Sequence, residues 1–310
     1  MINSRSILNI EDVLVDEEKY GSHHDDFMAL ANLSKELNPT SKYDINNLLD
    51  IWKKYRKHNE KQNLNRTDPS LFSGFKEIHG LQYLKDCVEQ GGVFATYHYG
   101  DYRHVPVEIV KSLDLNENNS IDMVVDNESY HSEMSLTLWK ELKEELFIKF
   151  IVSESETSGL KLLRKLRNGR SILLYLDGNS GSGDDSYPAE VNHISSRVQI
   201  RSGIFRLIQM LKKPLCVVLA DHNDQGEARL TAYPLITISK DNLQEGIDQS
   251  YEIFTKNLEK SPHLWRFWFR HHKYVNEWNR NSNHSEHKIH WRNRNGTLGV
   301  DLSTGNIYKI

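Results

Sequence analysis

The sequence predicts an α/β fold: a mixed, mostly parallel central sheet with helices on both faces, preceded by a helical N-terminal extension. Three observations lead to this fold class. The chain has 310 residues, 38% of them hydrophobic and 26% charged, which is typical of a globular protein with a sizeable core. From Phe75 onward, short apolar runs alternate with amphipathic segments of helical spacing. Strands separated by helices of this length are characteristic of sheets covered on both faces.

The elements follow from these local patterns in chain order. Residues 44–55 carry apolar side chains at helical spacing, which predicts a helix in the N-terminal extension. Apolar runs that predict strands lie at 75–79, 93–97, 121–125, 147–152, 171–176, 215–220 and 228–233. Amphipathic segments that predict helices lie at 81–89, 102–113, 134–146, 158–166, 204–211 and 243–258.

These elements predict three regions. Residues 1–66 form the helical N-terminal extension and residues 67–278 the α/β domain. Residues 279–310 form a C-terminal tail rich in Asn, His and Arg, which we expect to be irregular until Val300.

The composition of the chain argues against some classes of function. The formal net charge of −4 argues against a general nucleic-acid-binding protein. No run of about 18 apolar residues is present, and the N-terminus lacks a signal-peptide pattern, so we expect a soluble, cytoplasmic protein without a transmembrane segment. Peripheral contact with a membrane surface stays open. The two cysteines, Cys87 and Cys216, suit a reducing compartment and are expected to be small core residues.

The strongest candidate for chemistry is His98, which follows the predicted strand 93–97. A histidine at the carboxyl end of a strand lies where open α/β sheets hold ligands, and neutral imidazole can accept a proton near pH 7. Asp101 is close enough in sequence to orient this imidazole. Asp101 can also serve as the N-cap of the following helix, and a carboxylate has oxygens for both roles.

A second candidate is Asp177, which ends the apolar run 171–176 and precedes a loop rich in glycine and serine. If the strands are parallel, Asp177 lies on the same sheet edge as His98. The loop lacks the terminal Gly-Lys-Ser/Thr of a phosphate-binding loop, and Gly181-Ser182-Gly183 lacks the spacing of a serine-hydrolase elbow. The loop can equally be a simple turn.

Three further segments are rich in basic residues. Arg197 and Arg201 precede the predicted helix 204–211 and suit an anionic group, although they can equally be solvent-facing. The run 53–61 is either a solvated helix face or a surface for an acidic carrier protein or anionic lipid headgroups. In 262–274, aromatic and basic residues either close the core or line an acyl channel; His271 and His272 have no partner at a familiar metal spacing, so no metal site is predicted.

Taken in this order, the segments resemble the lysophospholipid acyltransferase-like superfamily, and most closely its lipid A biosynthesis (lauroyl/myristoyl) acyltransferase branch. The resemblance spans 75–274 and implies a glycerolipid acyltransferase-like sheet. Its blocks lie at 75–80, 91–102, 175–185, 193–218 and 262–273. The family's N-terminal membrane helix is absent, and its Phe-Phe-Gly block is replaced by the polar His193-Ile194-Ser195.

One departure from the family concerns the catalytic acid. The family's His-x4-Asp/Glu pair would place an acid where this chain has Arg103. Asp101 is the favoured replacement, and Asp177 or Asp126 are the alternatives; loss of catalysis is a further possibility.

The resemblance implies a soluble acyltransferase that moves an acyl group from a carrier-protein or coenzyme A thioester to a hydroxyl or amine. His98 would be the general base and Asp101 its orienting acid. Arg103, Asp177, Arg197 and Arg201 would contact substrate. No bound cofactor or metal is expected, and an acyl carrier or peptidyl carrier protein is the expected partner. The alternatives are a non-catalytic acyl-binding or scaffold protein of a biosynthetic complex, and a thioesterase that uses the same histidine.

Overall fold

The computed structural model describes residues 7–8, 24–40, 42–179, 181, 187–239, 241–278, 289–292 and 296–310. The chain forms two compact units. Unit 1 comprises Met1–Lys57, Asn192–Gln199 and Leu258–Ile310; unit 2 comprises His58–Val191 and Ile200–Asn257. The predicted boundaries at 66 and 278 divide the chain differently, because the N-terminal and C-terminal segments belong to one unit.

Unit 2 is built on a seven-stranded sheet with the strand order β2-β10-β9-β3-β6-β4-β5. All neighbouring strands are parallel except β9 and β10, which form an antiparallel pair. The mixed, mostly parallel sheet confirms the predicted fold class. Its strands are β2 (Glu77–His79), β3 (Val93–Thr96), β4 (Asp122–Val125), β5 (Lys149–Val152), β6 (Ile172–Tyr175), β9 (Leu215–His222) and β10 (Ala228–Ala232).

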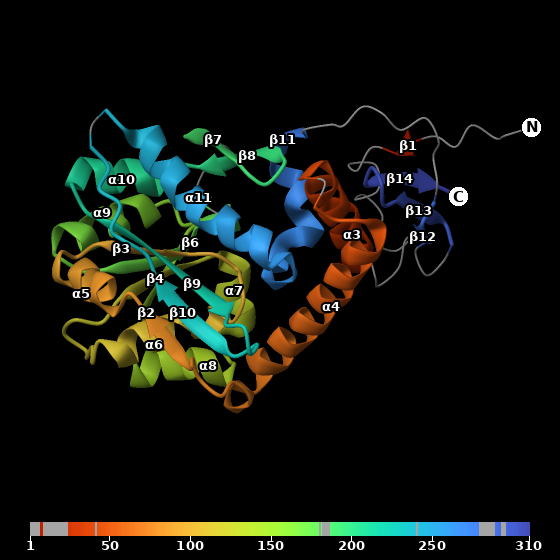
Figure 1. The fold of residues 1–310 in the computed structure, drawn as a ribbon. Coiled ribbons are helices and arrows are strands. Elements are labelled where there is room, and N and C mark those ends of the chain that lie inside the picture. Colours follow the sequence, from red (N-terminus) through yellow and green to blue (C-terminus); the bar gives the residue numbers. More distant parts are fainter. Residues whose placement is uncertain are drawn as a thin grey trace, which may run out of the picture. The chain divides into compact units, whose positions relative to one another are not determined.

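Helices cover both faces of this sheet (Figure 1). Phe94 of β3 packs into a core shared with α5 and α6, whereas Tyr97, three residues later, stacks on Phe254 of α11. Strand residues alternate between faces, so these contacts place α5 and α6 opposite α11. The helices are α5 (Leu81–Glu89), α6 (Val105–Ser112), α7 (Asn127–Glu133), α8 (Thr137–Lys140), α9 (Ser158–Arg167), α10 (Gly203–Leu211) and α11 (Leu243–Lys260).

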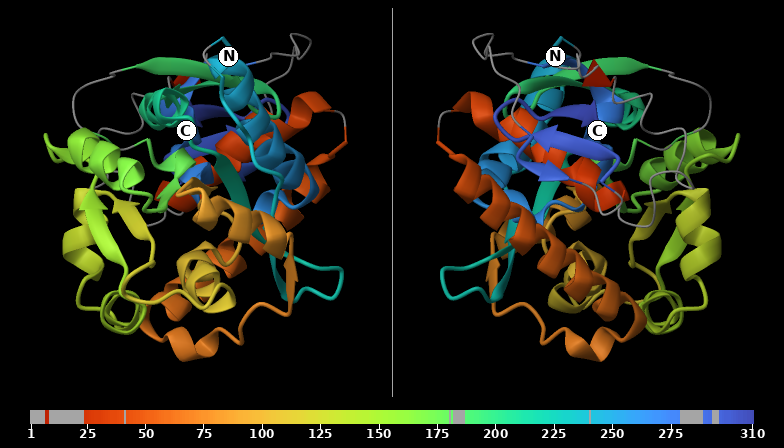
Figure 2. Two further views of the ribbon diagram at one scale, coloured as in Figure 1. Left: turned by 90° about the vertical axis from the view of Figure 1, so that its left-hand side faces the viewer. Right: turned by 90° about the vertical axis from the view of Figure 1, so that its right-hand side faces the viewer.

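Unit 1 combines N-terminal helices with C-terminal strands. Helix α3 (His24–Leu37) is followed by α4 (Ile45–Thr67), which continues into unit 2, and these two helices confirm the helical N-terminal extension. Gly305, in the turn between β13 and β14, packs so closely on α3 that an added Cβ would lie 2.7 Å from the carbonyl oxygen of Ala31. The views in Figure 2 show these blue C-terminal strands beside the orange-red α3.

The remaining strands lie outside the seven-stranded sheet. In unit 1, β1, β14, β13 and β12 form a four-stranded sheet, and β8 pairs antiparallel with β11 through Val198 and Val275. Their bounds are β1 (Ile7–Leu8), β7 (Pro188–Asn192), β8 (Ser196–Arg201), β11 (Val275–Trp278), β12 (Trp291–Arg292), β13 (Leu298–Asp301) and β14 (Asn306–Lys309).

Four predicted segments differ from the structure. The residues before helix 204–211, for which no strand was predicted, form strand β8. In the tail, β12 lies before Val300 and β13 begins before it, where an irregular segment was expected. The predicted helix 102–113 begins as a 3-10 turn, because Pro106 lacks the N–H of a helix interior and is suited to a helix start. The predicted helix 134–146 is replaced by the short helix α8 and a π-helical turn, Glu141–Glu145, and the separate helix α7 precedes this range.

Two other expectations concern the cysteines and the membrane. Cys87 and Cys216 are free thiols buried in the core, and burial raises the pKa of Cys87 well above its ordinary value. Within the part of the chain that the structure describes, no helix has both the length and the apolar character to span a bilayer.

Candidate active site

His98 and Asp177 lie side by side because their strands do. β3 and β6 are parallel neighbours, and Thr96 is paired with Tyr175. Two residues beyond this pair, both segments have passed the carboxyl ends of their strands. His98 and Asp177 therefore lie next to each other. This edge is where open parallel sheets place their binding sites.

Asp177 contacts His98 at two points. Its carboxylate accepts a hydrogen bond from His98 Nδ1 at 2.8 Å, and it accepts the backbone N–H of His98 at 3.0 and 3.2 Å. An ionised carboxylate can only accept, so Nδ1 carries the proton in this pair and Nε2 carries the basic lone pair. The side chain of His98 is 19% exposed and that of Asp177 only 5% exposed. The pair therefore consists of a buried orienting acid and a partly exposed imidazole.

Aromatic rings pack around the imidazole. The ring of His98 lies 4.5 Å from that of Tyr175 and 4.9 Å from that of Tyr102, measured between centroids. The hydroxyl of Tyr175 donates to the backbone carbonyl of Tyr102 at 3.0 Å. This contact ties the end of β6 to the turn after His98, and the packed rings restrict the orientation of the imidazole.

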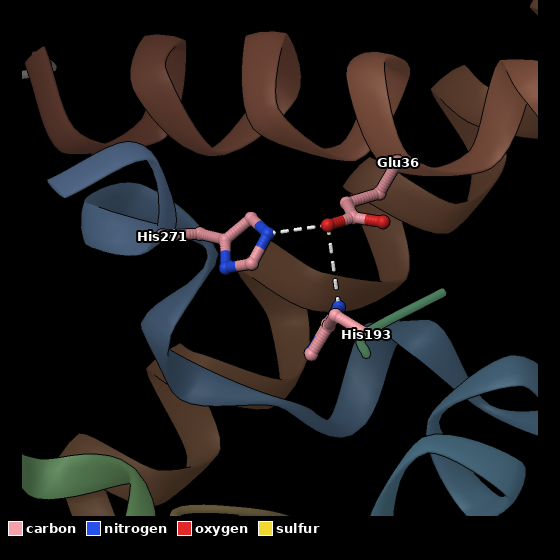
Figure 3. A group of neighbouring side chains, drawn as sticks. All are labelled: Glu36, His193 and His271. Carbon is pink, nitrogen blue, oxygen red and sulfur yellow. Dashed lines mark hydrogen bonds and ion pairs between the residues drawn. The ribbon is translucent and has the colours of Figure 1, made fainter. Parts of the chain in front are cut away.

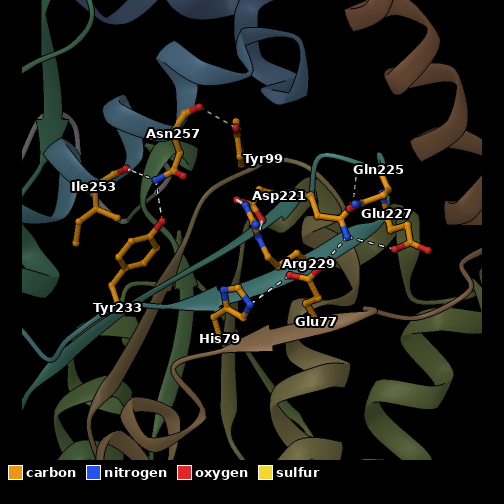
Figure 4. Close-up of polar contacts among 11 residues, drawn as sticks. Glu77, His79, Tyr99, Asp221, Gln225, Glu227, Arg229, Tyr233, Ile253 and Asn257 are labelled. Carbon is orange, nitrogen blue, oxygen red and sulfur yellow. Dashed lines mark hydrogen bonds and ion pairs between the residues drawn. The ribbon is translucent and has the colours of Figure 1, made fainter.

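Two tyrosines that flank His98 anchor the loop to α11. Tyr97 Oη donates to the carbonyl of Ser250 at 3.0 Å, and Tyr99 Oη donates to the carbonyl of Asn257 at 2.9 Å. The second contact is visible in Figure 4. Side chains on both sides of His98 thus fix its backbone, which favours a preorganised site.

Asp101 does not occupy the predicted position next to the imidazole of His98. Gly100 turns the chain with a φ of +59°, and Asp101 is completely buried. Its carboxylate accepts hydrogen bonds from Gln62 Nε2 at 2.7 Å and from His222 Nε2 at 2.9 Å. The expectation that Asp101 lies against His98 is therefore corrected: the carboxylate that contacts the imidazole of His98 is that of Asp177, the alternative.

The surroundings of Asp101 keep it ionised. Burial raises its pKa, but the hydrogen bond from His222 and the neighbouring Lys61 and His58 outweigh this effect and lower the pKa to about 2. Asp101 and His222 form a second acid–imidazole pair on the same sheet edge, and the His222 side chain is 19% exposed. A polar residue at the end of the apolar run 215–220 was the available sequence signal for His222.

The end of strand β9 is fixed by a polar cluster on the adjacent strands (Figure 4). Arg229 of β10 makes a bidentate ion pair with Asp221, with contacts of 2.9 and 2.7 Å. Asn223 donates to Glu77 of β2 at 2.7 Å. Both contacts hold the backbone on either side of His222 and thereby position this residue.

Arg103 is part of a buried ion pair. Its Nη1 donates to Glu133 at 2.7 Å, and the same carboxylate accepts the indole N–H of Trp139 at 2.9 Å. Arg66 lies 3.4 Å from the other oxygen of Glu133. The described contacts of Arg103 thus link the turn after His98 to α7, and its predicted contact with substrate stays untested.

The remaining predicted residues have separate locations. Arg201 is half-buried beside the loop after Asp177: its N–H donates to Asn179, and its guanidinium would lie 3.0 Å from a Cβ at Gly181. Arg197 is exposed on β8 in unit 1. Asp126 caps α7 by accepting the N–H and hydroxyl of Ser129.

In unit 1, a carboxylate and two imidazoles that the sequence did not connect lie together: Glu36, His193 and His271 (Figure 3). Burial raises the pKa of Glu36, but contacts with both histidines outweigh it and lower that pKa well below its usual range. The three residues come from distant parts of the chain, so no local spacing could have revealed them.

A scan against protein-family models and a search of curated proteins found no match for this chain.

Proposed function

We propose that this chain is an acyltransferase that moves an acyl group from a thioester to a hydroxyl or amine, with His98 as general base and Asp177 as its orienting acid. The observation that carries the proposal is the two-point contact between Asp177 and His98. Such a contact fixes one tautomer of the imidazole, which a histidine that accepts and returns a proton requires. The ordered sequence blocks that resemble lipid A acyltransferases favour acyl transfer over other histidine chemistry.

The proposed reaction has two proton transfers. His98 Nε2 removes the proton from the acceptor hydroxyl or amine as its oxygen or nitrogen attacks the thioester carbonyl carbon. The tetrahedral intermediate then collapses, the carbon–sulfur bond breaks, and the imidazolium returns the proton to the departing thiolate. Asp177 stabilises the imidazolium between these steps, as a carboxylate does in other acid–histidine pairs.

In this proposal, Asp177 takes the role of the acid that the family motif has and this chain lacks. Arg103 occupies the position of the family's acid, and Glu133 binds its guanidinium. A carboxylate from the neighbouring strand replaces the acid that lies four residues after the histidine in the family. The chemistry then needs neither an acid at position 103 nor Asp101 as a partner of His98.

The donor is proposed to be an acyl carrier protein or coenzyme A, both of which carry the acyl chain on a phosphopantetheine arm. Arg201, beside the loop after Asp177, suits its phosphate because guanidinium groups bind phosphate oxygens well. The exposed lysines Lys53, Lys54, Lys57 and Lys61 of α4 suit an acidic carrier protein. The cytoplasmic location and these partners remain predictions.

An intact-mass assay tests the proposal. The full chain is incubated with acyl-carrier thioesters or acyl-coenzyme A and a panel of hydroxyl and amine acceptors, next to a folded His98→Ala variant. Transfer to an acceptor that falls by about 10²–10⁴ in the variant supports the proposal. Free acid without an acylated acceptor would instead indicate a thioesterase, and a bound but intact thioester would indicate an acyl-binding protein.

A further inference from the structure

The interior of unit 1 contains three side chains of the kinds that bind transition metals. Glu36 lies near the end of α3, His193 lies between β7 and β8, and His271 lies in the 3-10 segment Arg266–Tyr274. Their side chains are 0%, 3% and 1% exposed. Figure 3 shows both imidazoles directed toward one oxygen of the Glu36 carboxylate. Among the described residues, this is the group whose donor atoms converge in this way.

The donor atoms lie close enough together to share one ion after a rearrangement of the side chains. His193 Nδ1 lies 3.3 Å from Glu36 Oε1, and His271 Nε2 lies 2.5 Å from the same oxygen. All three donor atoms lie within 4.8 Å of one another. Ligands bound at about 2.0–2.1 Å in a tetrahedral site are roughly 3.4 Å apart, so small side-chain rotations would fit one ion between them.

Neighbouring groups hold the carboxylate in place. The backbone N–H of Ser195 donates to Glu36 Oε2 at 2.6 Å, and the hydroxyl of Ser196 donates to Oε1. Metal ligands are commonly oriented by such outer contacts. The ring of Trp265 lies 5.3 Å from each of the two imidazole rings, so the surroundings are largely aromatic.

Charge gives a further reason to expect a cation. A carboxylate without exposure to solvent is costly unless positive charge and hydrogen bonds compensate it, and the serines and histidines around Glu36 already supply part of this compensation. A divalent ion bound to two neutral imidazoles and one carboxylate would supply this charge. Imidazole nitrogen and carboxylate oxygen together are typical ligands of zinc, which is commonly bound by two histidines and one glutamate.

We propose that Glu36, His193 and His271 bind one zinc ion inside unit 1. Binding requires a lone pair on His271 Nε2, so the proton that this atom shares with Glu36 moves to Nδ1 or to solvent. The inference does not depend on the proposed acyl transfer, because none of the three residues belongs to the His98 site.

Metal titration tests this inference. The full chain is stripped with a chelator and titrated with Zn²⁺, and with Co²⁺ as a spectroscopic probe whose visible absorption reports the ligand set. We expect one equivalent to bind, and Glu36→Gln and His271→Ala to weaken binding by at least about 10²-fold. His272→Gln is the matched control, because His272 is adjacent in sequence but contacts Asn32 at 2.9 Å; this variant should bind normally.

A second measurement applies if the ligand variants do not fold. Zn²⁺ at about 100 times its dissociation constant should stabilise the chelator-treated wild-type chain by a measurable rise in Tm, because the ion binds the folded state. Failure of the wild-type chain to bind one equivalent at micromolar Zn²⁺ would overturn the proposal, as would equal binding by Glu36→Gln. Either result would identify the cluster as a carboxylate–imidazole hydrogen-bond network.

Discussion

Asp177 accepts hydrogen bonds from both the backbone N–H and the Nδ1 of His98, although 79 positions separate the two residues. The parallel register of β3 and β6 creates this contact, and the loop after His98 directs Asp101 to His222 instead. The catalytic proposal therefore depends on a tertiary pairing of strands rather than on a short sequence motif.

Gly100 is required for this loop, and alanine should not be tolerated there. Its φ is +59°, and an added Cβ would lie 1.7 Å from the carbonyl oxygen of Ala220. We expect Gly100→Ala to lower the free energy of unfolding by about 3 kcal/mol, measured by urea denaturation. Gly159→Ala is the control: beyond its chain neighbours and its own helix, no atom lies within 4 Å of the added Cβ, and stability should change by less than about 1 kcal/mol at this second residue of α9. Equal stability of the two variants would contradict the described turn.

The ion pair between Arg103 and Glu133 should be structural. Their side chains are 12% and 9% exposed, and removing one partner of a buried pair leaves the other charge uncompensated. We expect Arg103→Met to cost about 3 kcal/mol of unfolding free energy. The double variant with Glu133→Gln should cost less than the sum of the two single changes.

Placing an acid at position 103 should not raise the proposed acyl-transfer activity. Arg103→Glu would place a second carboxylate against Glu133 and repel it. Higher acyl transfer by a stable Arg103→Glu protein would show that position 103, rather than Asp177, supplies the acid.

His104 should make stability depend on pH. Burial lowers the pKa of His104 from 6.5 to about 4, despite the nearby carboxylates of Asp101 and Glu141. Below pH 6.5 the unfolded chain binds a proton that the folded chain does not, so stability falls as the pH drops to 4, by about 3 kcal/mol in total. His104→Phe should reduce this slope between pH 6.5 and 4 in denaturation series. An unchanged slope would mean that His104 is protonated in the folded protein.

Much of the α/β architecture could be predicted because each strand and helix has its own local pattern. Helix α5 has the predicted bounds, and the apolar run before His98 forms β3. His98 and Asp177 could also be predicted as site residues, because both directly follow predicted strands that end at the same edge of the sheet. The identity of the acid that contacts His98 could not be predicted, because it depends on which strand neighbours β3 and on the positive φ of Gly100.

Many residues that contact one another in these sites are far apart in the sequence. Glu133 lies 30 positions from Arg103, and Glu36 lies 235 positions from His271. Neither spacing repeats or matches a motif, because the tertiary fold alone brings these side chains together. Strand β8 was not predicted, because its polar, alternating residues were interpreted as the segment that precedes a helix.

The comparison of Asp177→Asn with Asp101→Asn tests the central claim most directly. Both substitutions replace a buried carboxylate by its neutral isostere, but only Asp177 contacts His98 through its side chain. The rate of acyl transfer from a loaded carrier protein is measured for both variants after circular dichroism has shown that each is folded. We predict a loss of at least about 10²-fold for Asp177→Asn and less than about 10-fold for Asp101→Asn. Undiminished transfer by Asp177→Asn, or an equal loss in both variants, would contradict the assignment of Asp177 as the acid of His98.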